Sequence, residues 1–301
     1  MTSTLVIEIW GGMGDALLAT PALKALKLSR PDLDLRVRCQ ENHFEVLEHN
    51  PHLDYVSFRA DDPGFADAPA LHTNYGRLYP SITSRKHASE LIADLLGVTL
   101  DDRTLTVGLT EADEQKAMDI VFGYRNPITL HITSGSLHYK NWPLDRWVAL
   151  VRRMPECTFI QLGEEKDPRV ASAVDVRGMT TAREAIAVVK HSRCFVGVDS
   201  FLNHATRAVG TPGVVLFGPS TPTLWGHPEN TNIYKAVACS PCVDTIGTDP
   251  CPHAHRCMTT ISVDEVEAAI SRMLEAPRPD LRAGHSEREG SADPKRELPH
   301  R

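Results

Sequence analysis

The chain has 301 residues, 42% of them hydrophobic and 24% charged, with a formal net charge of −7. Because single domains usually have about 100–200 residues, we expect two domains. No uninterrupted apolar run approaches the roughly 20 residues of a membrane-spanning helix, which excludes an integral membrane protein. The negative charge argues against nucleic acid as a partner, although a local basic cleft could hold a diphosphate. The first residues lack a secretory signal, so we expect a cytoplasmic protein.

The first third of the chain predicts a strand-helix-strand unit. Three short apolar runs are expected to be strands: Leu5–Trp10, Leu35–Cys39 and Tyr55–Phe58. Thr20-Pro21 supplies capping residues for a helix over Ala22–Leu28. A kinked helix that begins near Asp15 is the alternative. This order of elements implies a right-handed parallel unit.

The segment Arg59–Arg85 mixes Asp, Pro, Gly, His and Tyr without a period, which predicts a long loop with little regular structure. Beyond it we expect a helix over His87–Leu96 that Gly97 ends. A strand over Leu105–Leu109 and a helix over Glu111–Phe122 follow.

A second alternating series occupies the rest of the chain. Its expected strands are Ile128–Ile132, Thr158–Leu162, Cys194–Val198 and Val214–Phe217, and its expected helices are Leu144–Arg152, Thr181–Lys190 and Leu202–Val209. Two doubly wound α/β units in tandem place a cleft between the carboxyl ends of two parallel sheets. We expect a boundary near Tyr124–Pro127, with domains over residues 1–125 and 126–275. Residues 276–301 are rich in Pro, Gly, Ser and charge, which predicts a disordered tail.

A glycine-rich segment, Trp10-Gly11-Gly12-Met13-Gly14-Asp15, follows the first expected strand. Glycines there let the backbone approach a ligand and expose amide donors. It is no dinucleotide fingerprint, because Leu17 stands where the last glycine would be needed, and the chain has no phosphate-binding G-K-[ST] sequence. A tight strand-to-helix turn is the alternative reading, with Asp15 as a carboxylate favoured by the helix dipole.

The sequence GGMGDALLATPALKAL resembles the N-terminal signature of glycosyltransferase family 9, which contains the lipopolysaccharide heptosyltransferases. The resemblance implies a GT-B fold, two Rossmann-like doubly wound domains that face each other across a cleft. It also implies that Asp15 is the catalytic base and that Gly12, Met13 and Gly14 lie at the donor. In this family the region of Arg59–Leu109 belongs to the acceptor-side domain, and here it is shorter than expected.

Two further segments resemble the donor site of this family. Ser134-Gly135-Ser136 and the following Lys140 resemble the segment in which small hydroxyl residues and a lysine meet the phosphates. Leu162-Gly163-Glu164-Glu165 ends a strand where the family has a carboxylate for the ribose. Glu165 is the first choice and Glu164 the second. A solvated surface lysine and an acidic first turn of a helix are the alternatives.

The most specific resemblance is Val196–His204, which matches a family strand followed by Asp-Ser/Thr-Gly and, after two residues, His. It implies that the donor-binding residues include Asp199, Ser200, Phe201 and His204. The amides of Ser200 and Phe201 would open a helix where a diphosphate binds. Phe201 replaces the usual glycine, and its side chain would narrow the phosphate site or stack on the donor.

Four cysteines, Cys239, Cys242, Cys251 and Cys257, are spaced as C-x2-C-x8-C-x5-C in the loop 239–257. Four thiolates suit a tetrahedral structural site for zinc or iron. Reduced thiols without metal and disulfides are the alternatives, and the expected cytoplasmic location disfavours disulfides. Related chains, among them autotransporter heptosyltransferases, carry cysteine clusters of this kind.

The resemblance implies an inverting transferase that moves a sugar, heptose from ADP-heptose in the first place, to a hydroxyl of a saccharide, lipid-linked saccharide or protein. Lipopolysaccharide biosynthesis is the implied process. Catalysis would require no cofactor, and peripheral membrane contact is left open. Two alternatives remain: a GT-B enzyme with another nucleotide sugar, and a non-catalytic protein that binds a sugar nucleotide or a metal on the same scaffold. Turnover of ADP-heptose with and without acceptors would separate them.

Overall fold

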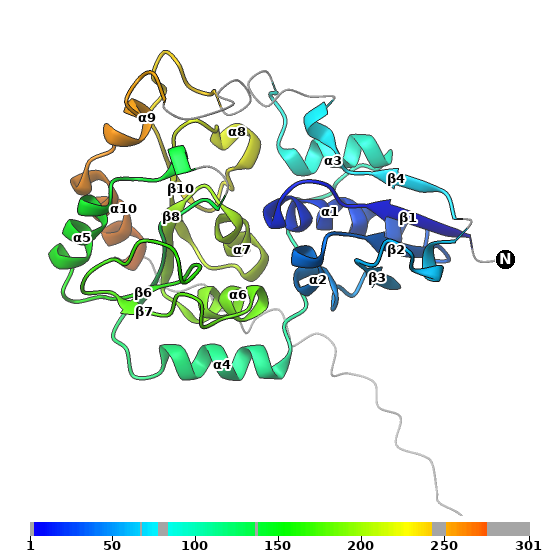
Figure 1. Cartoon of the computed structure of the whole chain (residues 1–301), viewed down its shortest axis with the longest axis horizontal. Helices are drawn as coiled ribbons and strands as arrows, with labels where there is room; N and C mark the ends of the chain where they lie inside the picture. The colour runs from blue at the N-terminus through cyan, green and yellow to red at the C-terminus, as the bar shows by residue number, and fades with distance from the viewer. Residues whose placement is uncertain (1–2, 67, 78–83, 136–137, 243–250, 276–301) are drawn as a thin grey trace, which may run out of the picture.

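The computed structural model describes residues 3–66, 68–77, 84–135, 138–242 and 251–275. Ser136 and the tail 276–301 lie outside this described part, so the expectations for them are not addressed by it. Two parallel sheets, each with helices against it, make up two halves of the chain (Figure 1). The fold is α/β, as the sequence predicts.

The N-terminal sheet has the strand order β3-β2-β1-β4, and all its pairings are parallel. Its strands are β1 (Thr4–Glu8), β2 (Asp34–Arg38), β3 (Tyr55–Ser57) and β4 (Ala70–His72). Its helices are α1 (Met13–Ser29), α2 (Glu41–Leu47) and α3 (Ala88–Leu96), with short 3-10 turns η1 (Pro63–Phe65) and η2 (Tyr75–Arg77). Gly97 ends α3 in the left-handed conformation, as expected.

Helix α1 contains Pro21 in its interior, so the alternative of one long helix is correct and the start at Ala22 is wrong. A proline at position 21 cannot donate to the carbonyl of Leu17, four residues earlier. The hydroxyl of Thr20 donates to that carbonyl instead, at 2.7 Å. The same hydroxyl oxygen accepts from the amide of Thr106 at 2.9 Å. The Thr20 hydroxyl therefore supplies the hydrogen bond to the Leu17 carbonyl that Pro21 cannot donate.

Two expectations for the N-terminal half are wrong. Within Arg59–Arg85, the residues that the structure describes include a fourth strand, β4, beside β1, and the short turns η1 and η2, which the expected loop did not include. Leu105–Leu109 forms no strand, although Leu105 is buried in the core. The apolar residues alternate there because the segment packs as an extended chain against α1. It does not pair with β1, because β4 already occupies that edge of the sheet.

The C-terminal sheet has the order β10-β9-β8-β5-β6-β7 and is parallel throughout. Its strands are β5 (Pro127–His131), β6 (Thr158–Gln161), β7 (Val174–Asp175), β8 (Cys194–Val198), β9 (Gly213–Phe217) and β10 (Thr231–Tyr234). Its helices are α5 (Leu144–Arg153), α6 (Ala182–His191), α7 (Phe201–Val209), α8 (Pro222–Trp225), α9 (Arg256–Thr259) and α10 (Val263–Glu275), with a 3-10 turn η3 (His138–Lys140). The four expected strands are confirmed to within one residue.

Helix α4 (Glu111–Val121) packs against α6, below the C-terminal sheet in Figure 1. Glu114 on α4 accepts hydrogen bonds from Lys190 and, at 2.5 Å, from His191, both on α6. Since these contacts attach α4 to the C-terminal half, we propose that the domain boundary lies before α4 rather than near residue 125.

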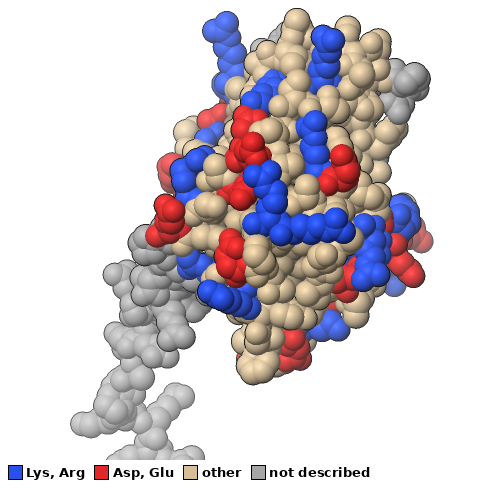
Figure 2. Space-filling model, turned by 90° about the vertical axis from the view of Figure 1, so that its left-hand side faces the viewer, with Lys and Arg blue, Asp and Glu red and all other residues tan. Residues whose placement is uncertain are grey.

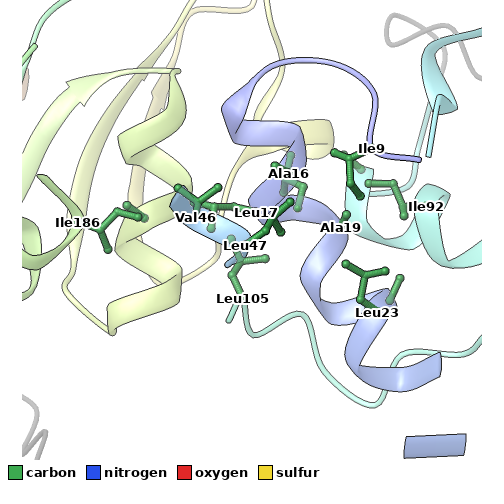
Figure 3. Close-up of a cluster of buried hydrophobic side chains, with 14 of the residues drawn as sticks. Ile9, Ala16, Leu17, Ala19, Leu23, Val46, Leu47, Ile92, Leu105 and Ile186 are labelled. Carbon is green, nitrogen blue, oxygen red and sulfur yellow. The ribbon is translucent and has the colours of Figure 1, made fainter. Parts of the chain in front are cut away.

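The two halves touch directly through apolar and charged side chains. Figure 3 shows Ile186 of α6 beside Val46 of α2, at the margin of the buried cluster that surrounds α1. Arg183 on α6 also pairs with Glu48 at 2.9 Å and donates to the carbonyl of Glu45 at 3.1 Å. These contacts hold the carboxyl ends of the two sheets near each other.

The outer face formed by α5 and α10 carries interspersed charges of both signs (Figure 2). Arg153 on α5 joins the two helices through Asp264 at 2.6 Å and Glu267 at 2.8 Å. Such exposed pairs contribute little to stability. No helix in the described ranges is both long and apolar enough to cross a membrane.

Candidate active site

A pocket of about 430 Å³ lies between the two halves, at the carboxyl ends of β5, β6 and β8. The N-terminal half contributes Gly12, Met13, Gly14 and Asn42. The C-terminal half contributes His131, Thr133–Gly135, Leu162–Glu164, Asp167, Thr180–Ala182, Ala185 and Ser200–Leu202. A ligand in this place is typical of doubly wound sheets. The pocket therefore brings together the glycine-rich turn and the helix start that the sequence singled out.

Two helices, α1 and α7, begin at this pocket. Gly12 caps α1, and Ser200 caps α7 without a side-chain hydrogen bond to its first turn. A methyl group on Gly14 would lie 2.8 Å from the His204 ring and 3.7 Å from the Cα of Phe201. Glycine therefore allows the two helix starts to approach each other. Their amide donors and dipoles favour an anion at this point.

The hydroxyl of Ser200 is engaged by His131, whose Nδ1 lies 2.8 Å away. Burial lowers the pKa of His131 to about 4, although the charges of Asp167 and Glu164 oppose this effect. The imidazole is therefore neutral near pH 7 and acts as a hydrogen-bonding group. His131 was not among the residues predicted from the sequence, although its place at the end of an expected parallel strand was a usable signal.

Asp15 lies in the first turn of α1 and is half-buried. One carboxylate oxygen accepts from the amide of Gly12 at 2.7 Å, and the other accepts from the Tyr75 hydroxyl at 2.6 Å. Burial raises the pKa of Asp15 above its ordinary value, against the lowering effects of these two hydrogen bonds and of Lys140. A carboxylate with a raised pKa is a stronger base than an exposed one.

Lys140 has a protein partner that is distant in the sequence. Its ammonium group is 2.7 Å from the carboxylate of Asp199, and both side chains are buried. The Ser220 hydroxyl donates to the same oxygen of Asp199 at 2.6 Å. A buried pair needs such additional hydrogen bonds to offset the loss of water. Lys140 is thus held in place before any donor binds.

Three buried histidines lie behind the start of α7. His204 and His227 are joined by a 3.0 Å hydrogen bond, and the ring centroid of His87 is 5.4 Å from that of His227. Burial lowers the pKa of His204 to about 3 and that of His227 to about 2. His204 is accordingly neutral and packs against Gly14 instead of lining the pocket.

Comparison with known protein families shows which family the chain belongs to. The profile of glycosyltransferase family 9 (heptosyltransferase) matches residues 84–251, which is more than half of the chain. The chain belongs to glycosyltransferase family 9. It is 26% identical to lipopolysaccharide heptosyltransferase 1 of Pseudomonas aeruginosa over 241 residues, or 72% of this chain and 67% of that protein. The family assignment makes the protein a glycosyltransferase.

Solved structures share the fold of this family 9 member. A family 9 glycosyltransferase from Veillonella parvula aligns over 90% of this chain and 97% of its own, with a TM-score of 0.71 at 17% identity. The dodecameric, iron-containing heptosyltransferase TibC of Escherichia coli, in complex with ADP-D-β-D-heptose, aligns over 91% and 77% with a TM-score of 0.71 at 15% identity. Heptosyltransferase II of E. coli aligns over 91% and 98%, with a TM-score of 0.63 at 13% identity. These similarities show the GT-B fold.

The two glutamates considered for the ribose of the donor lie differently relative to the pocket. Glu164 lines the pocket together with Asp167, whose carboxylate accepts from the Glu164 amide at 2.8 Å. Glu165 is absent from the described lining, and its backbone and Cβ lie near Gly178 instead. We therefore transfer the proposed ribose contact from Glu165 to Glu164. Phe201, in contrast, lies at the pocket wall as the first residue of α7.

The four clustered cysteines lie near one another beyond β10. Cys242 and Cys257 are buried, and the amide of Cys242 donates to the Pro219 carbonyl at 2.8 Å. Burial raises the pKa of the Cys257 thiol to about 11, and the neighbouring Cys242, Cys239 and Cys251 raise it further. No group of three or more His, Cys, Asp or Glu within the described ranges has the arrangement of a metal site. Residues 243–250 of the loop are outside those ranges.

Proposed function

We propose that this family 9 glycosyltransferase moves heptose from ADP-heptose to an acceptor hydroxyl with inversion at the anomeric carbon. The observation that carries the proposal is the place of Asp15, in the first turn of α1 where that turn meets the start of α7, whose N-cap Ser200 makes no side-chain capping hydrogen bond. A base and an anion site are thereby adjacent. The TibC complex with ADP-D-β-D-heptose and the similarity to a lipopolysaccharide heptosyltransferase support this choice of donor.

In the proposed reaction Asp15 takes the proton of the acceptor hydroxyl as its oxygen attacks the anomeric carbon. The new glycosidic bond forms while the bond to the phosphate oxygen breaks, and ADP leaves with the electron pair. The amide groups at the starts of α1 and α7 stabilise the negative charge that develops on the diphosphate. The proton ends on Asp15 and passes to solvent, so the step is balanced.

Lys140 supports the leaving group in this proposal. Its ammonium group has three N–H donors, and Asp199 accepts from one of them at 2.7 Å. Asp199 and the nearby Trp225 ring fix the position of the nitrogen. Lys140 is buried and lies outside the pocket lining, so we propose that its ammonium group acts on a bound phosphate mainly through its charge. We place the hydroxyl groups of Ser134 and Thr133, which line the pocket, at the same phosphates.

For the acceptor, we propose a lipid-linked saccharide of the lipopolysaccharide type, in the cytoplasm. The similarity to the Pseudomonas heptosyltransferase supports this class over a protein hydroxyl. Calorimetric titration with ADP, UDP and GDP tests the donor first. We expect ADP to bind most tightly of the three. Equal affinity for the three nucleotides would contradict the proposed preference for adenine in the donor.

The two adjacent glutamates allow a matched test of the pocket. Glu164→Gln is expected to weaken ADP binding about tenfold, because it removes a charged acceptor from the proposed ribose contact. Glu165→Gln, one residue further, should leave the affinity unchanged. Both substitutions remove one carboxylate of the same loop, so they alter its net charge equally. A larger loss of ADP affinity in the Glu165 variant would restore the original choice of residue.

We also propose that Cys239, Cys242, Cys251 and Cys257 bind one structural metal ion, zinc or iron. The spacing of the four cysteines in the sequence supports this, as does the iron in the related TibC. Thiolate ligands suit both metals, and a metal would stabilise a loop with three prolines and a glycine that lacks helical or strand periodicity. The ion would have no part in sugar transfer.

Elemental analysis of protein purified without a metal-affinity tag tests this site. About one equivalent of zinc or iron is expected in the wild type and a large loss in Cys242→Ser/Cys257→Ser, with a lower midpoint of thermal unfolding. Far less than one equivalent in both proteins, with the four thiols titratable in the native wild type, would show that the cysteines are reduced thiols without metal.

A further inference from the structure

Tyr75 connects Asp15 with the C-terminal half of the enzyme. Its hydroxyl donates to one carboxylate oxygen of Asp15 at 2.6 Å and accepts from the indole Nε1 of Trp225 at 2.9 Å. Tyr75 opens η2 in the N-terminal half and is buried, while Trp225 ends α8 in the other half (Figure 1). The three side chains form one continuous hydrogen-bonded row across the two halves.

The direction of both hydrogen bonds is fixed by chemistry. An indole N–H can only donate, so the phenol oxygen must accept from Trp225. An ionised carboxylate can only accept, so the one phenol proton must point to Asp15. Burial and the charge of Asp15 raise the pKa of Tyr75 well above its ordinary value, so the phenol keeps this proton near neutral pH.

Trp225 is itself attached to the proposed phosphate site. Its ring faces the Lys140 ammonium group, with 4.9 Å between the nitrogen and the ring centroid. Its carbonyl accepts from the amide of Asn203 at 2.9 Å, and Asn203 also contacts Asp199 at 3.5 Å. One indole thus contacts the cation proposed to act on the donor phosphates and the phenol that holds the base.

We propose that Tyr75 is a positioning residue for the catalytic base, and that Trp225 sets the orientation of Tyr75 and so ties the base to the donor-binding half. The inference rests on the proposed function of Asp15. Without the phenol proton, the carboxylate would keep its hydrogen bond from Gly12 but lose the contact that fixes its second oxygen. The base would then be less well aligned on the acceptor hydroxyl.

Removal of the hydroxyl should also change the pH dependence of the reaction. The groups that face Asp15 are Tyr75, Lys140 and Asp199, with neutral His204 packed beside Gly14. The Tyr75 hydrogen bond lowers the pKa of Asp15, so its loss raises that pKa. Because the base must be ionised to act, activity is lost at a higher pH as the solution is acidified.

The first test is Tyr75→Phe, which keeps the ring. We expect kcat to fall about tenfold or more, the fold-change that a hydrogen bond to a charged group supports. The acid limb of kcat/KM should move to higher pH, with an unchanged KM for the donor. Tyr55→Phe is the matched control, because Tyr55 also donates to a carboxylate, Asp62 at 2.8 Å, far from the pocket. It should leave all three quantities unchanged.

The second test separates Trp225 from Tyr75. Trp225→Phe removes the indole donor but keeps an aromatic ring near Lys140, so the acid limb should move in the same direction by a smaller amount. In a Tyr75→Phe background the same substitution should produce no additional movement, since its effect on Asp15 passes through the phenol. If the shifts of the acid limb in the two single variants added up in the double variant, the effect of Trp225 would not pass through Tyr75.

A readout without turnover keeps this inference separate from the proposed function. The carboxyl carbon of Asp15 can be titrated by NMR and assigned from its absence in Asp15→Asn. Its titration should move to higher pH in Tyr75→Phe and stay in place in Tyr55→Phe. An unmoved titration together with an unmoved acid limb would overturn the positioning role. If the wild type transferred no sugar but the titration of Asp15 still moved to higher pH in Tyr75→Phe, the proposed function alone would be contradicted.

Discussion

Asp15→Ala is expected to lower the turnover of sugar transfer by about 10²–10⁴-fold, the range for loss of a general base. The effect should fall on kcat, because Asp15 acts as the base in the chemical step. No other described carboxylate lies in its place, in contact with both Gly12 and Tyr75. Affinity for ADP should change little. Steady-state rates at saturating donor, with calorimetry for ADP, measure the two quantities separately.

Asp15→Asn is the matched control for the structural part of this loss. Asparagine keeps one oxygen that can accept from the Gly12 amide, so the start of α1 stays capped, while its NH2 group replaces the oxygen that accepts from the Tyr75 hydroxyl. It cannot take a proton from the acceptor. Turnover should therefore remain as low as in the alanine variant while thermal stability approaches that of the wild type. An asparagine variant with wild-type turnover would show that Asp15 only caps the helix.

Lys140→Ala should lower the free energy of unfolding by about 3–5 kcal/mol, because it leaves Asp199 buried without its cation. Asp199 would retain the hydrogen bond from Ser220, which offsets only part of that loss. Affinity for ADP should also fall, since the charge proposed to act on the phosphate is gone. Denaturation in urea measures the first effect and calorimetry measures the second.

The double variant Lys140→Met/Asp199→Asn separates these two effects. It removes both charges, so it should recover much of the stability that Lys140→Ala loses. ADP affinity should stay low in the double variant, because the cation is still absent. Recovery of both ADP binding and stability in the double variant would show that Lys140 acts on the fold alone. Wild-type stability of Lys140→Ala would show that the pair with Asp199 does not stabilise the fold.

The parts of the fold that the sequence predicted are those with a local signal. The buried strands of the C-terminal half are short apolar runs, and β8 was predicted with its observed bounds, Cys194–Val198. Gly97 marked the end of α3 because a left-handed residue favours glycine. The glycine-rich turn and the Asp199-Ser200 segment were also found from the sequence, because each directly follows a strand that is visible as a short apolar run.

The parts that were missed depend on contacts between distant residues. The Thr20 hydroxyl donates to the Leu17 carbonyl in place of the amide hydrogen that Pro21 lacks. Helix propensities of single residues do not predict such a replacement. Tyr75 gave no signal, because its partners are 60 and 150 residues away. Lys140 was interpreted as a cation without a protein partner, since its pairing with Asp199 spans 59 residues. Long-range pairing of polar groups is what the sequence pattern does not encode.

The central claim is that Asp15 on α1 takes the proton of an acceptor hydroxyl, whose oxygen attacks the anomeric carbon of a donor held at the start of α7. The measurement that tests it most directly is ADP release from ADP-heptose by the wild type and by Asp15→Asn, with and without lipid-linked core saccharides. The account predicts acceptor-dependent release of ADP by the wild type and at least a 10²-fold lower rate in the variant. Equal rates in the two proteins, or release that no acceptor increases, would contradict it.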